Sequence, residues 1–167
     1  MSQRNRILIG IFILMLIFGV FLGMDLVQYW NAISAQSRFP DIPDGSIPLY
    51  VNGELVATFT TDDLDDLSMQ SFVEVEEGKT EEGWLLRDVL LLHVGTDLLF
   101  SDTVIIVSST SRDKSAWLTW EQVQDLENMV LFDLSGRGTL KLVSRLEKLD
   151  TRDEWVQDVE EIEIETP

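Results

Sequence analysis

The stretch at residues 108–112 carries side chains that readily bind an anion. Three serines and a threonine precede Arg112, directly after the β-branched run at residues 103–107. Hydroxyl groups and a guanidinium at the end of a buried strand can hold an anion or a small ligand, because binding groups concentrate on loops that a rigid scaffold positions. A plain turn accounts for the same small polar residues. Both interpretations stay open.

His93 is the second candidate for chemistry, since an imidazole can serve as a general base or a metal ligand. It lies near the predicted end of a helix, where the helix C-terminus also stabilises a partly exposed histidine. The chain has this single histidine and no cysteine, which excludes disulfides, thiolate nucleophiles and two-histidine metal motifs. We therefore predict no catalytic residue, no metal site and no cofactor.

Acidic residues dominate the charge of the chain. Its 167 residues contain 30 Asp and Glu against 12 Lys and Arg, a net charge of −18, which argues against a nucleic-acid partner. Two acidic clusters, at residues 62–66 and 74–82, are interpreted as a solvated face. Alternatively, they bind a hard cation or a basic partner protein. A carboxylate pair that hydrolyses a glycosidic bond is a further hypothesis.

The N-terminus has the pattern of a membrane anchor. Residues 7–24 contain no charge and are long enough, at roughly 27 Å as a helix, to cross a bilayer. Arg4 and Arg6 precede the apolar run, so residues 1–6 are predicted to be cytoplasmic and the remainder extracytoplasmic. A cleaved signal peptide is the alternative, but its apolar core is usually shorter. A Pro-containing linker is expected at residues 25–47 and an exported domain at residues 48–165.

Strand and helix signals alternate irregularly in the exported domain. Asn52-Gly53 between two apolar runs predicts a hairpin. Helices are expected after Thr61, over residues 84–94 with Gly95 at the C-terminal end, and after Thr119, which forms a capping box with Gln122. Further strands are expected at residues 72–75, 103–107, 129–134, 140–143 and 162–165. We predict an α+β fold, a mixed β-rich domain with a few short helices after one transmembrane helix.

Three segments resemble the molybdopterin-binding domain of the sulfite oxidase family. They are residues 75–78 (VEEG) followed by 83–90 (GWLLRDVL), residues 104–107 (VIIV) followed by 118–121 (LTWE), and residues 136–143 (GRGTLKLV) followed by Trp155 and Ile162. The resemblance implies that residues 48–164 have that family's fold.

The same resemblance argues against the family's activity. The position of the molybdenum-ligating cysteine is occupied by Val75, which offers no thiolate. A degenerate cofactor cleft could still bind a small anion or a pterin-like molecule. Its expected lining is Ser109, Arg112, Lys114, Arg137 and Lys141.

Two tryptophans are candidates for contact with a partner. Trp117 and Trp120 lie three residues apart where a helix is predicted to begin, so one of them could anchor a partner protein. We therefore expect a membrane-anchored, extracytoplasmic binding domain without catalysis, a subunit or docking module of a membrane complex, in a bacterial envelope. A ligand-binding domain is the alternative, and a carboxylate-based hydrolase is the third hypothesis.

Overall fold

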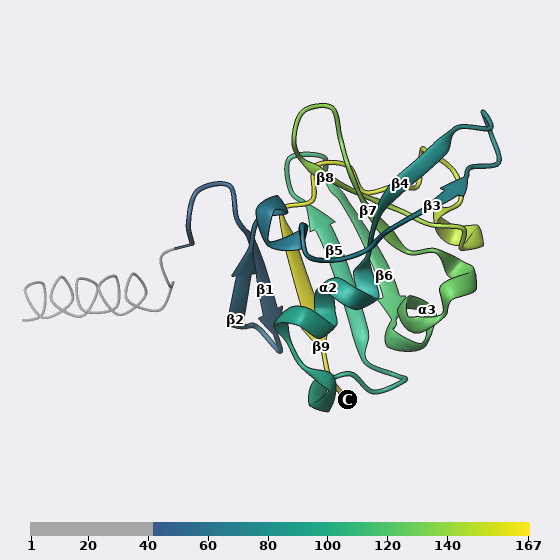
Figure 1. Ribbon diagram of the computed structural model, residues 1–167. Coiled ribbons are helices and arrows are strands. Elements are labelled where there is room, and N and C mark those ends of the chain that lie inside the picture. Colours follow the sequence, from purple (N-terminus) through teal and green to yellow (C-terminus); the bar gives the residue numbers. More distant parts are fainter. Residues whose placement is uncertain (1–41) are drawn as a thin grey trace, which may run out of the picture. The chain divides into compact units, whose positions relative to one another are not determined.

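The computed structural model describes residues 42–167, and the first described strands form the predicted hairpin (Figure 1). Strand β1 (Ile47–Val51) pairs antiparallel with β2 (Glu54–Phe59). Asn52 and Gly53 turn the chain with φ values of 51° and 78°, the left-handed region that this turn requires. The hairpin prediction is confirmed.

The hairpin belongs to a five-stranded sheet with the order β2-β1-β9-β5-β6. Its other members are β5 (Val104–Ser109), β6 (Lys114–Thr119) and β9 (Glu161–Glu165). Strand β9 lies between the two hairpins, parallel to β1 and antiparallel to β5. Burial alternates along β5 and β9, so one face of the sheet is packed and the other faces outward.

A second sheet has four strands in the order β3-β4-β7-β8, all antiparallel. They are β3 (Met69–Val73), β4 (Thr80–Leu85), β7 (Leu131–Leu134) and β8 (Leu140–Val143). Gly83 lets β4 approach β7 closely. A Cβ atom at this position would lie 2.0 Å from the carbonyl oxygen of Phe132.

Two hydrophobic clusters hold the sheets. The larger joins the inner face of the five-stranded sheet, helix α2 (Leu86–His93) and one face of the second sheet, including Phe59, Trp84 and Phe132. The smaller covers the other face of the second sheet. It consists of Phe72, Leu85, Leu131, Val143 and Trp155.

The prediction of an α+β fold is wrong, because residues 42–167 form a β-rich domain with two short α-helices, α2 and α3 (Trp120–Gln124). The remaining helical turns are 3-10 helices at Thr61–Leu64, Thr96–Leu98, Leu126–Asn128 and Glu147–Leu149. The helix expected over residues 84–94 begins only at Leu86, since Trp84 and Leu85 pair with β7 as the end of β4. The capping box of Thr119 and Gln122 is confirmed.

The predicted transmembrane helix at residues 7–24 lies outside the described residues, as do residues 1–6 and most of the linker. Within residues 42–167, every helix is too short or too polar to cross a membrane. The linker was expected to reach residue 47, where β1 in fact already begins.

Candidate functional site

The hydroxyl-rich segment at residues 108–112 is the end of β5 and the turn into β6. Ser109 is buried, and its hydroxyl lies 3.3 Å from that of Ser111. The backbone N–H groups of Thr110 and Ser111 donate to the carboxylate of Glu160, at 3.0 Å and 3.2 Å. Hydrogen bonds from the Ser111 side chain and from both amides outweigh burial and lower the pKa of Glu160. A carboxylate of the chain itself therefore occupies the donors that an anion would use.

Arg112 and Arg137 converge, as the predicted cleft requires, but they converge on Asp158. Arg112 Nε lies 2.6 Å from one carboxylate oxygen, and Arg137 Nη2 lies 2.8 Å from the other. The Thr139 hydroxyl donates to the same carboxylate at 2.7 Å. The bond from Thr139, which exceeds the effect of burial, and the two guanidinium groups lower the pKa of Asp158. One carboxylate thus binds both guanidinium groups and offsets part of their positive charge.

Lys141 belongs to a separate cluster on the four-stranded sheet. Its Nζ lies 2.6 Å from Glu81, 2.9 Å from Asp133 and 4.6 Å from the centre of the Trp155 ring. Burial, followed by the hydrogen bond with Asp133, raises the pKa of Glu81 despite the neighbouring ammonium. The carboxylate pair that a hydrolase would need is thus joined by a lysine, which favours a structural role for these groups.

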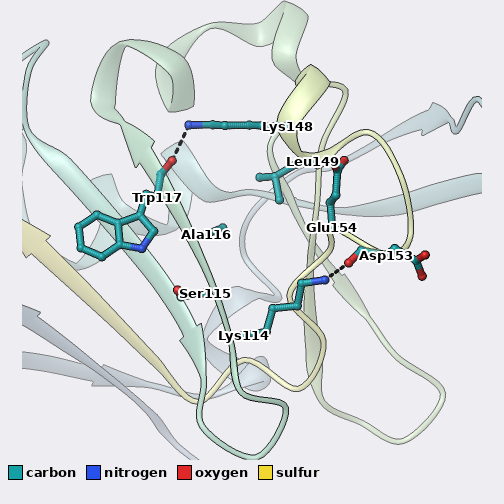
Figure 2. Close-up of a pocket in the computed structure, with 8 residues that line it drawn as sticks. All are labelled: Lys114, Ser115, Ala116, Trp117, Lys148, Leu149, Asp153 and Glu154. Carbon is teal, nitrogen blue, oxygen red and sulfur yellow. Dashed lines mark hydrogen bonds between the residues drawn. The ribbon is translucent and has the colours of Figure 1, made fainter.

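Lys114 borders a groove of about 320 Å³ along β6, the edge strand of the five-stranded sheet (Figure 2). The ammonium of Lys114 donates to the carbonyl of Asp153 across the groove. Lys148 donates to the carbonyl of Trp117, at 2.5 Å, and to Gln122 Oε1, at 2.9 Å. Burial lowers the pKa of Lys148. Lysines therefore bridge the edge of β6 to the segment that follows β8.

Two smaller hollows adjoin this groove, and each includes Lys114. One of about 300 Å³ has Ser109 in its lining, and one of about 240 Å³ has Arg112. The structure thus brings Ser109, Arg112 and Lys114 around neighbouring hollows, joins Arg137 to them through Asp158, and holds Lys141 in its own cluster. Each of these basic groups has a partner within the chain. The partner is a carboxylate for Arg112, Arg137 and Lys141, and the backbone carbonyl of Asp153 for Lys114.

His93 and the acidic clusters assemble no reactive centre in the described part of the chain. The imidazole stacks on Phe59 with 5.1 Å between ring centres, and burial lowers the pKa of His93 despite the nearby Asp63. No group of three or more His, Cys, Asp or Glu residues within 42–167 is arranged to hold a metal ion.

The two candidate tryptophans have different surroundings. Trp120 is buried in the larger cluster, so its ring packs inside the domain. Trp117 is 57 % exposed, and Figure 2 shows its ring pointing away from the groove. It lies opposite Ile106 on β5, in a cross-strand row that continues through Glu163 to Tyr50. These side chains lie on the outward face of the five-stranded sheet, which the sequence pattern alone did not reveal as a surface.

Val75, where the resembled family has its metal-ligating cysteine, is 84 % exposed in the turn between β3 and β4. The carboxylate of Glu74 organises this turn by accepting the N–H groups of Glu76 at 2.7 Å, Glu77 at 2.9 Å and Lys79 at 3.3 Å. Burial alone would raise the pKa of Glu74, but these three donors together lower it.

Sequence reasoning missed two carboxylates of this site: Asp158, which pairs with Arg112 and Arg137, and Glu160, which accepts the N–H groups of Thr110 and Ser111. Both follow Trp155 within one acidic stretch, and their distance along the chain from Arg112 gave no signal of contact. The family resemblance stays a prediction. No model of a known protein family matches this chain, and no curated protein matches it.

Proposed function

We propose that this chain is a membrane-tethered, extracytoplasmic binding domain without catalysis, which serves as an accessory subunit of a membrane complex. Its partner protein contacts the outward face of the five-stranded sheet around Trp117. The observation that carries the proposal is the exposed indole of Trp117 at the end of a partly apolar row across four strands. The apolar residues 7–24 support the tether.

The size of the exposed ring supports a role in binding. A tryptophan buries up to about 250 Å², so covering the exposed 57 % of Trp117 removes roughly 140 Å² from water. At about 25 cal/mol per Å², this burial contributes up to about 3.5 kcal/mol before the entropy cost of association, which is in the range of a residue that dominates an interface. Ile106 lies directly beside the ring in the sheet register and extends the apolar contact.

Ion pairing within the chain supports binding over catalysis. Asp158 holds Arg112 and Arg137, and the carboxylates of Glu81 and Asp133 hold Lys141. A catalytic group has to reach a substrate in a protonation state that allows proton transfer or attack. These groups instead bind one another.

The test compares two variants of the full chain that carry the same new charge. Trp117→Glu alters the proposed surface, and Leu126→Glu alters a residue that is 51 % exposed outside the sheet. Each variant and the wild-type protein are captured through a C-terminal tag from mild detergent extracts of the cells that make the protein. Native electrophoresis and mass spectrometry then identify what is bound.

We expect a partner in constant stoichiometry with the wild-type protein and with Leu126→Glu, and its loss with Trp117→Glu. Thermal unfolding of both variants checks that the domain remains folded. Recovery of the wild-type protein alone contradicts the proposal. Retention of the same partner by a folded Trp117→Glu variant contradicts the assignment of the surface.

A further inference from the structure

Strand β3 forms an edge of the four-stranded sheet, next to β4. Glu74 N–H donates to the carbonyl of Lys79, which marks this pair as hydrogen-bonded in the antiparallel ladder. Hydrogen-bonded and non-hydrogen-bonded pairs alternate along such a ladder. The register therefore directs the N–H and C=O groups of Met69, Ser71 and Val73 away from β4, toward the open edge.

The side chains of β3 do not protect this edge. Four of its five residues are exposed, including Met69 at 46 % and Val73 at 60 %, and none of the five is charged or a proline. Proteins usually protect edge strands with lysines, prolines or covering segments. Strand β6 has that protection, because Lys148 reaches the carbonyl of Trp117. In Figure 1, the β3–β4 hairpin extends from the body of the domain.

Both ends of this uncharged strand are acidic. Asp65 and Asp66 are exposed just before it. Glu76 and Glu77 lie in the turn after β3, where Lys79 and Arg152 offset part of their charge. An extended segment that pairs with β3 would thus have its middle beside apolar and hydroxyl side chains, and its ends beside carboxylates.

We propose that β3 binds an extended segment of another protein by strand addition, and that this segment has apolar or β-branched residues in its middle and Lys or Arg at both ends. Backbone hydrogen bonds to Met69, Ser71 and Val73 supply the pairing, and the acidic ends select the partner. The charges disfavour a second copy of this chain. In an antiparallel pair, Asp65 and Asp66 of each copy would face the acidic turn of the other. The site is separate from the Trp117 surface and does not depend on it.

The direct test uses a synthetic peptide with alternating Val and Thr in its middle and two Lys at each end. Its control has Glu in place of every Lys. Binding to the full chain in a non-ionic detergent is measured by fluorescence anisotropy, and amide hydrogen exchange is followed in parallel. We expect the peptide with Lys ends to slow exchange at Met69, Ser71 and Val73, whose amides face the open edge, more than at Phe72, whose amide is already bonded within the sheet.

Charge variants test the role of the acidic ends. Neutralising three carboxylates at β3 is compared with neutralising three exposed carboxylates elsewhere, so that the net charge changes equally. The β3 set is Asp65→Asn, Asp66→Asn and Glu76→Gln, which covers both ends of the strand, and the control set is Asp97→Asn, Asp102→Asn and Glu121→Gln. We expect the β3 set to raise the dissociation constant of the peptide about threefold to tenfold at low salt. The control set should change the logarithm of this constant by less than about half as much.

Ser71→Pro tests the backbone pairing, because it removes an N–H group that faces the open edge, a position where an edge strand tolerates proline. We expect this variant to lose the bound peptide. If it fails to fold, the charge variants and the exchange pattern still decide the question. Equal binding of both peptides, binding without slowed exchange at the three amides, absence of binding by the peptide with Lys ends, or dimerisation of the chain through β3 would each overturn the proposal.

Discussion

Asp158 offers a decisive test of ion pairing within the chain, because one carboxylate holds Arg112, Arg137 and Thr139. The substitution Asp158→Asn removes its charge and keeps its size. It also suits the backbone, since residue 158 has φ 54° and asparagine tolerates the left-handed region. A change in stability therefore reports mainly on the lost charge.

The magnitude follows from the contacts. The hydrogen bond from Thr139 to a charged, largely buried carboxylate contributes about 1.5 kcal/mol. The side chains of Arg112 and Arg137 are 42 % and 58 % exposed, so each ion pair contributes only about 0.5 kcal/mol because of solvent screening. The amide oxygen of asparagine retains part of the first bond. We expect the free energy of unfolding to fall by about 2 kcal/mol at pH 7.

The assay is urea unfolding of wild-type protein, Asp158→Asn and the control Asp153→Asn, which is expected to change stability by less than about 0.5 kcal/mol.

The pH dependence provides a second check. The folded-state pKa of Asp158 lies below its ordinary value of 3.8, so the stabilisation that its charge provides is present above pH 3.8 and is lost as the pH falls through the folded-state pKa. The difference between wild type and variant must therefore shrink as the pH falls below 3.8. Added sulfate should stabilise Asp158→Asn more than wild type, because two guanidinium groups become available. A difference that persists unchanged at acidic pH, together with equal responses to sulfate, would refute the reasoning.

Three further substitutions test a close contact between strands, an ion pair on the four-stranded sheet and the cap of helix α3. Gly83→Ala should lower the free energy of unfolding by about 3 kcal/mol or more, because its Cβ would lie 2.0 Å from a backbone oxygen of β7, and denaturant unfolding measures this loss. Lys141→Met should cost about 2–4 kcal/mol at pH 7, since it leaves two carboxylates facing each other. That loss should decrease as the pH falls to about 4.5, because the pKa of Glu81 is raised in the folded state and its protonated form then stabilises the fold. Thr119→Ala should cost about 1 kcal/mol in thermal unfolding, and Thr119→Ser should restore most of it.

The elements that were predicted correctly depend on local signals. The turn at Asn52-Gly53 needs two left-handed residues, and the capping box of Thr119 is complete within four residues of sequence. In contrast, Trp84 and Leu85 fit a helical pattern as well as a strand, and pairing with β7 decides the outcome. Propensity is a weak signal when tertiary contacts compete with it.

The candidate site was harder to predict than the fold. The sequence identified Arg112 and Arg137 as basic groups that could converge, but Asp158, which binds both, lies more than 20 residues further along the chain. Trp117 and Trp120 looked equivalent in the sequence, and only the start of α3 separates an exposed ring from a buried one. Contacts between distant segments and the direction of a side chain depend on tertiary structure, which local patterns do not encode.

The position of β9 also affects how the domain can form. The hairpin of β1 and β2 and the hairpin of β5 and β6 meet only through β9, which follows all eight other described strands in the chain. Until β9 is inserted, the five-stranded sheet consists of two unconnected hairpins. Leu49 on β1 and Ile105 on β5 then lie on strands that lack their β9 partner. Pairing between such distant segments slows folding, because loop entropy is lost before the contacts form. We therefore expect the five-stranded sheet to be completed only when β9 pairs, and until then the facing edges of β1 and β5 are open to pairing with other chains.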